Sequence, residues 1–116
     1  MWKKKKGRKF SRKTDQRRAL LRSLAEALFI RGKVRTTEAK AKETAILAEK
    51  MITRGKKGDL SASRYLAIYF NKDLVKKIMK ETAPKYKERK GGYTRVTKLE
   101  PRKSDAARMA IVELIK

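Results

Sequence analysis

The sequence predicts an α/β fold: a small three-stranded mixed sheet packed with about four helices, preceded by an extended basic N-terminal arm. Two observations predict it. Apolar residues recur at helical spacing over long stretches between residues 14 and 82. Shorter segments rich in β-branched or aliphatic residues lie at 33–37, 93–97 and 109–115. The length of 116 residues suits one compact domain, expected over residues 14–116, after an arm of residues 1–13.

The arm is defined by its charge. Between Met1 and Arg18 there are six Lys and four Arg against one Asp, a net charge of +9. Its only large apolar residues are Met1, Trp2 and Phe10, so it cannot bury a face of its own. We therefore expect residues 1–13 to be disordered until they meet a partner.

The first helix and first strand follow the arm. The helix is predicted to begin at Thr14, where Leu20, Leu24 and Leu28 give one apolar stripe, and to stop at Gly32. Residues 33–37 then indicate a short strand because three of the five are β-branched.

Two further helical regions are predicted from their caps. Thr37 is placed to cap a second helix that ends near Gly55. Asp59 is placed to cap a third helical region, which is interrupted at residues 71–73 and continues until Pro84 ends it.

Two strands complete the fold. The nearly continuous apolar run at 109–115 predicts a strand that is covered on both faces and therefore central in the sheet.

The charge of the whole chain points to a polyanionic partner. There are 35 Lys and Arg residues against 12 Asp and Glu, a net charge of +23. The positive charges of so short a chain repel one another. Nucleic acid, an anionic membrane surface or an acidic protein would relieve this repulsion. No apolar run approaches the roughly 20 residues of a membrane-spanning helix, and no apolar stretch follows the basic start as in a secretory signal. Membrane insertion is therefore not expected.

Catalysis finds little support in the residue types. The chain has no Cys and no His, which removes thiol nucleophiles, the commonest zinc ligands and the usual general base. Neither a phosphate-binding P-loop nor a dinucleotide fingerprint is present. We expect a binding protein rather than an enzyme, with no cofactor, no metal and no small-molecule substrate, and the lack of Cys fits the cytoplasm.

The candidate nucleic-acid contacts are mainly cations. The arm could instead be a solubilising tail, and Arg22 could simply pair with Glu26. Tyr93 could stack on an unpaired base or pack in the core, and the same choice is open for Trp2 and Phe10. The full set comprises Lys3, Lys4, Lys5, Lys6, Arg8, Lys9, Arg12, Lys13, Arg17, Arg18, Arg22, Arg35, Lys40, Gly91, Gly92, Tyr93, Arg95, Arg102 and Lys103.

Several of these residues lie in motifs that resemble one family. The motifs are Gly7-Arg8-Lys9, Arg18 through Leu24, Thr36-Thr37 followed by Lys40-Ala41-Lys42-Glu43, Gly91-Gly92-Tyr93-Thr94-Arg95, and Asp105 through Leu114. In this order they are similar to bacterial large-ribosomal-subunit protein L-seventeen. The resemblance implies a structural constituent of the large subunit in the cytoplasm. It also implies that the arm and the domain bind large-subunit ribosomal RNA near the nascent-chain exit, beside neighbouring ribosomal proteins.

Two other classes of function are weighed against this resemblance. A free DNA- or RNA-binding regulator would be expected to show a helix-turn-helix or a dimerisation heptad, and neither is clear in the sequence. A membrane-active cationic peptide would need a strongly amphipathic helix, which the distributed polar residues do not give. A ribosomal protein is therefore the predicted function.

Overall fold

The computed structural model describes residues 14–115. Within this range no helix is both long enough and apolar enough to cross a membrane. The elements in chain order are α1 (Thr14–Arg31), β1 (Lys33–Thr37), α2 (Glu38–Gly55), α3 (Leu60–Ala67), α4 (Lys72–Lys77), the π-helical turn η1 (Ile78–Thr82), α5 (Ala83–Lys85), β2 (Thr94–Lys98) and β3 (Met109–Leu114). The predicted α/β class is confirmed.

The three strands form one sheet in the order β1-β3-β2, with β3 in the centre as predicted. Val112 of β3 is flanked by Val34 of β1 and by Val96 of β2. Both pairings are antiparallel. The sequence predicts a mixed sheet, and this part of the prediction is wrong. The reason is topological. The crossover from β1 to β2 leaves these two strands parallel to each other, and the hairpin after β2 then inserts β3 between them, antiparallel to both.

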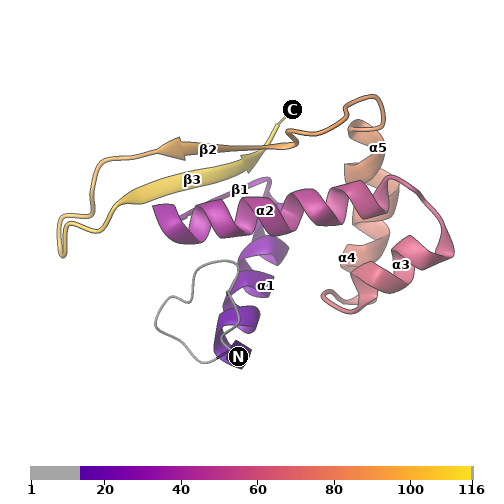
Figure 1. Cartoon of the computed structure of the whole chain (residues 1–116), viewed down its shortest axis with the longest axis horizontal. Helices are drawn as coiled ribbons and strands as arrows, with labels where there is room; N and C mark the ends of the chain where they lie inside the picture. The colour runs from indigo at the N-terminus through magenta and orange to yellow at the C-terminus, as the bar shows by residue number, and fades with distance from the viewer. Residues whose placement is uncertain (1–13, 116) are drawn as a thin grey trace, which may run out of the picture.

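Helix α2 covers one face of this sheet and runs along it (Figure 1). Ala110 and Val112 of β3 are 0% exposed beneath it, and the small side chains of Ala41 and Ala48 on α2 are buried in the same core. Small residues on both surfaces let the helix approach the strands closely. This contact is the centre of the molecule's core.

The other face of the sheet carries no helix of the described chain, so the predicted cover on both faces of β3 is wrong. Met109, Ile111 and Glu113 alternate with the buried residues of β3 and are half-buried. The alternation of a pleated strand sends these three side chains to the face away from α2. The sequence at 109–115 predicts burial on both faces because Glu113 is its only charged residue.

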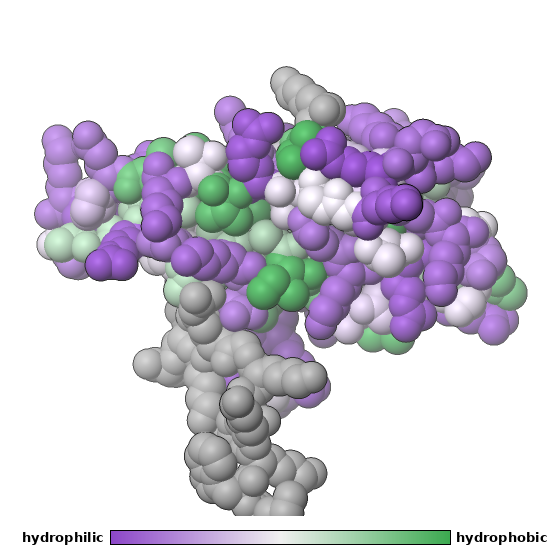
Figure 2. Space-filling model, turned by 45° about the horizontal axis from the view of Figure 1, so that its top comes forward, coloured by the Kyte–Doolittle hydropathy of each residue, from purple (hydrophilic) through white to green (hydrophobic). Residues whose placement is uncertain are grey.

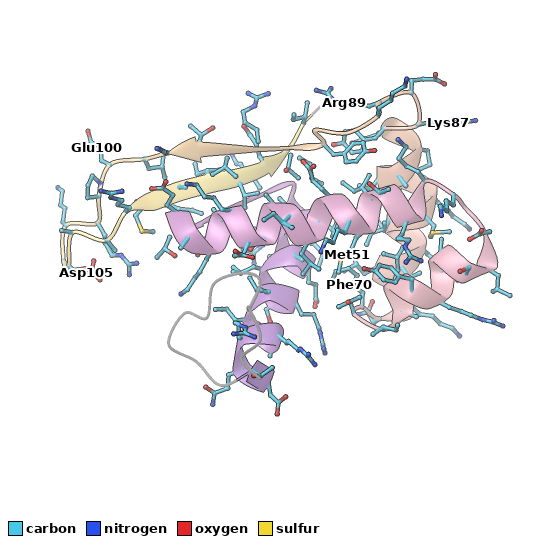
Figure 3. All side chains as sticks on the ribbon, viewed as in Figure 1. Met51, Phe70, Lys87, Arg89, Glu100 and Asp105 are labelled. Atoms are coloured by element: carbon cyan, nitrogen blue, oxygen red, sulfur yellow. The ribbon has the colours of Figure 1, made fainter. Side chains whose placement is uncertain are left out.

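Helices α3, α4 and α5 gather at one end of α2, and the β2–β3 hairpin projects at the opposite end (Figure 1). The caps predicted at Thr37 and Asp59 are confirmed, since their side chains accept from the backbone N–H groups of Lys40 and Ala62. Asn71, where the interruption was predicted, caps α4 in the same way through the N–H of Leu74. Met51 and Phe70, labelled in Figure 3, are buried in the core between these helices.

The helical path does not end at Pro84, contrary to the prediction. It continues through the π-helical turn η1 into α5, which ends at Lys85. Pro84 therefore lies in the first turn of a new helical segment. Proline is tolerated there because the first N–H groups of a helix have no intrahelical acceptor. The hydrogen bonding changes from α to π type in η1, directly before α5, so that a new helical segment begins there.

Candidate nucleic-acid interface

The face of the sheet that α2 leaves uncovered is the first candidate, and we call it the open sheet face. Strand register places its side chains in rows, because directly paired residues point to the same side. One row is Lys33–Glu113–Arg95, and the next is Arg35–Ile111–Thr97. Two predicted contact residues, Arg35 and Arg95, which lie 60 positions apart in sequence, are thus brought to one surface.

Cations outnumber anions on this face. Lys33, Arg35 and Arg95 are exposed, and Glu113 is the one carboxylate among the side chains of these rows. Arg95 lies 3.8 Å from Glu113 between Nη1 and Oε1, but 60% of the Arg95 side chain remains exposed. A long, exposed pair of this kind holds the guanidinium in place only weakly. Arg95 is therefore free to bind a phosphate.

The hairpin that follows β2 extends the open sheet face. A hollow of about 460 Å³ lies there. It is lined by Arg35 and Ile111 of the face and by the hairpin residues Leu99, Glu100, Pro101, Arg102 and Lys103. Two more of the predicted contacts thus join Arg35. The hairpin is held by backbone bonds of 2.8 Å from the Arg102 N–H to the Ala107 carbonyl and from the Ala106 N–H to the Arg102 carbonyl.

The remaining predicted contacts between residues 14 and 115 lie away from this face. Arg18 and Arg22 are exposed on α1 and Arg17 is half-buried there, while α1 projects away from the sheet (Figure 1). Within the described residues no ion pair joins Arg22 to Glu26. Lys40 is half-buried in the first turn of α2, on the covered side of the sheet. The predicted contacts at positions 3–13, together with Trp2 and Phe10, fall outside the described residues.

Tyr93 is a core residue. Of the two alternatives left open by the sequence, the structure therefore supports packing in the core and contradicts stacking on a base. Tyr93 is 2% exposed, and its ring lies 5.2 Å from the ring of Tyr86. The Tyr93 hydroxyl accepts from Lys56 Nζ at 2.8 Å and donates to the Arg89 carbonyl at 3.2 Å. Gly91 and Gly92 are exposed just before it, and Gly92 has a φ of 66°. That left-handed turn sends the tyrosine ring inward.

The surface beside this turn and the hairpin is polar. Lys87 and Arg89 mark the segment after α5, while Glu100 and Asp105 mark the hairpin loop (Figure 3). Figure 2 shows a mainly hydrophilic surface with small, separate apolar patches. No three His, Cys, Asp or Glu side chains between residues 14 and 115 come together to hold a metal ion.

The first turn of α2 carries a carboxylate of its own, Glu38. Glu38 accepts from Lys42 Nζ at 3.0 Å, and this hydrogen bond lowers the pKa of Glu38, as do the charges of Lys98 and Arg108. A carboxylate in the first turn is also favoured by the positive end of the helix dipole. Burial raises the pKa of two tyrosines, Tyr65 and Tyr86.

Lys33 was not among the contacts predicted from the sequence. It lies two residues before Arg35 in the predicted strand, so the period of two would have placed both on one face. Its neighbour across the sheet, Glu113, was missed because the apolar run at 109–115 predicts uniform burial. Only the pairing of the strands shows that these residues share a surface.

Comparison with known proteins agrees with the family resemblance of the motifs. The family model described as Ribosomal protein L17 matches residues 20–115. The "Large ribosomal subunit protein bL17" of Thermoanaerobacter pseudethanolicus is 52% identical over 109 residues, covering 93% of this chain and 97% of that protein. Those of Clostridium beijerinckii and Desulfitobacterium hafniense are 52% and 50% identical, with 93% of this chain covered in each case and 96% and 97% of the relative. The chain therefore belongs to the ribosomal protein L17 family and is a structural ribosomal component rather than an enzyme.

Proposed function

We propose that this ribosomal protein binds large-subunit ribosomal RNA through residues 1–13 and the open sheet face, and so stabilises the RNA fold. One observation carries the proposal: Arg35 shares one uncovered surface with Arg95, Arg102 and Lys103, which follow it by 60 or more positions in the sequence. The relatives are named as proteins of the large ribosomal subunit. The protein belongs to the cytoplasmic ribosome of bacteria.

The chemistry of the face suits an RNA backbone. Arginine presents a planar fork of donors that can bind a phosphate with two hydrogen bonds, and lysine adds a point charge. Ile111 and Leu99 between the cations offer an apolar surface against which a ribose or a base can pack. Each phosphate neutralised releases counterions, so the affinity should depend steeply on salt.

The position in the ribosome is part of the same proposal. The resemblance to the family supports a place near the nascent-chain exit, with other large-subunit proteins as neighbours. The net charge of +23 supports the RNA partner, because a chain of this size is relieved of self-repulsion when phosphates surround it.

Salt-dependent binding tests the proposal. The affinity of the full chain for protein-free large-subunit RNA is measured between about 50 and about 300 mM salt, a range over which phosphate contacts weaken strongly. The double variant Arg35→Gln/Arg95→Gln should lower the slope of log affinity against log salt by about 1–2, since each phosphate left without its cation removes roughly 0.7–0.9. Melting temperatures should stay unchanged, because both side chains are exposed.

The matched control removes the same charge elsewhere. Lys72→Gln/Lys76→Gln changes two exposed cations of α4, which lies away from the open sheet face. This control should change the slope by less than half as much. Equal effects of the two double variants would mean that only total charge matters, and absence of RNA binding by the wild type would end the proposal.

A further inference from the structure

A second hollow, of about 440 Å³, lies where the end of α1, the turn η1 and the end of the sheet meet, and we call it the junction cleft. Its cationic lining is Arg31, Lys33, Lys77 and Lys85. Arg31, Lys33 and Lys77 are not among the contacts predicted from sequence, and for Lys85 the sequence leaves a phosphate contact and a solvated loop both open. The volume lies within the range of roughly 300–1,000 Å³ that small-ligand pockets occupy.

The cleft is held open by bonds between its three walls. Lys77 Nζ donates to the Ile30 carbonyl at 3.1 Å and so ties α4 to the end of α1. The Leu114 N–H donates to the Gly32 carbonyl at 2.9 Å and ties β3 to the same end. The Tyr86 hydroxyl donates to the Ile115 carbonyl and closes the third side. These bonds fix the relative positions of the three walls.

Three kinds of group face the cleft. Ammonium and guanidinium groups can hold a phosphate, and Ile30 and Leu114 give apolar surface against which a base can pack. Glu81 and Glu113 add carboxylates, which accept hydrogen bonds from the amino groups of bases. Between residues 14 and 115 no ion pair or hydrogen bond occupies the Glu81 side chain. A site for phosphate alone would gain nothing from these carboxylates, because they repel it.

We propose that the junction cleft takes up one unpaired nucleotide of the bound ribosomal RNA, with its phosphate on the cations and its base in the cleft. The inference rests on the proposed function. Lys33 and Glu113 line both the cleft and the open sheet face, so the two surfaces are continuous. An RNA strand on the face can therefore place a neighbouring nucleotide in the cleft. The π-helical turn lines it, as such turns frequently do at functional sites.

Blocking the cleft without changing its charge tests the proposal. Ile30 lines the cleft and is 53% exposed, so Ile30→Trp should fill the mouth while the domain stays folded. Ile46 on α2 is also 53% exposed but does not line the cleft, so Ile46→Trp is the matched control. The probes are a short RNA hairpin with a single-nucleotide bulge and the same hairpin without it. Affinities are measured with the full chain.

The wild type should prefer the bulged hairpin about tenfold, a difference of about 1.4 kcal/mol. Ile30→Trp should abolish this preference while leaving affinity for the paired hairpin within about twofold, and Ile46→Trp should keep it. A wild type that binds both hairpins equally, or Ile30→Trp with its preference intact, would overturn the cleft proposal and leave the proposed function standing. A wild type that binds no RNA would overturn both.

A second variant separates base recognition from charge. Glu81→Leu removes a negative charge from an exposed position of η1, so electrostatics alone would raise the affinity for both hairpins equally. If Glu81 accepts from a base, the preference for the bulged hairpin should instead fall severalfold. An unchanged ratio of the two affinities would exclude this role for Glu81.

Discussion

At the scale of single residues, the cluster around Tyr93 shows how a motif that looks like a binding loop can be a structural device. Lys56 donates to the Tyr93 hydroxyl and to the Arg89 carbonyl, and its Nζ lies 5.0 Å from the centre of the Tyr93 ring. The same ring packs on Tyr86. These contacts fasten the turn at 91–92 to the end of α2, so the glycines serve the fold.

Removing the hydroxyl tests that role. Tyr93→Phe keeps the ring but leaves the Lys56 ammonium with one fewer acceptor, so we expect a loss of about 1–2 kcal/mol in the free energy of unfolding. Urea unfolding measures it. Affinity for ribosomal RNA should stay within about twofold at a temperature where both proteins are folded. Weaker RNA binding with unchanged stability would show instead that Tyr93 contacts the RNA.

At the scale of elements, the packing of α2 against its neighbours sets the shape of the domain. Gly55 at the end of α2 is buried, and a Cβ placed there would lie 3.3 Å from the Cβ of Ala83 and 3.5 Å from Cγ2 of Ile78. The absence of a side chain lets η1 and α5 pass close to α2.

Filling that space should be costly. Gly55→Val adds methyl groups where there is no room, and we expect a loss of about 1–3 kcal/mol in the free energy of unfolding. The comparison is Gly91→Val, because nothing lies within 4 Å of a Cβ at Gly91 and its φ is an ordinary one. Denaturant titration of both variants should show the larger loss at Gly55. Equal losses would mean that backbone entropy, and not packing, decides the effect.

The elements were predictable where local chemistry defines them. Thr37 and Asp59 cap helices because their side chains reach N–H groups three residues on, and that is visible in sequence. The cover over β3 was not predictable, because it depends on where distant helices pack. The meeting of Arg35 with Arg102 likewise depends on strand pairing. The path through Pro84 was missed because a π-helical turn has no clear sequence signal.

At the scale of the whole molecule, the domain and the basic arm are expected to have different roles. The described domain supplies the core and the open sheet face, while residues 1–13 carry eight positive charges and no negative ones. We expect that deleting them leaves the domain folded, because their only large apolar residues are Met1, Trp2 and Phe10. RNA affinity should fall and its salt dependence should flatten, because fewer phosphates are then neutralised.

Two measurements decide the arm's role. Circular dichroism and melting temperature report whether the truncated domain is folded, and a salt titration of RNA binding reports how many phosphates the arm neutralises in the full chain. If the truncated protein bound ribosomal RNA with the same affinity and the same salt slope as the full chain, the arm would be a solubilising tail.

The central claim is that the open sheet face lies on ribosomal RNA, and protein–RNA cross-linking on assembled large subunits tests it most directly. Cross-links mapped to single residues should fall on Arg35, Arg95, Arg102 or Lys103, in addition to those on the arm. The exposed side chains of α3 serve as the internal comparison and should give few. Cross-links confined to α3 and the arm, with none on the open sheet face, would contradict the account.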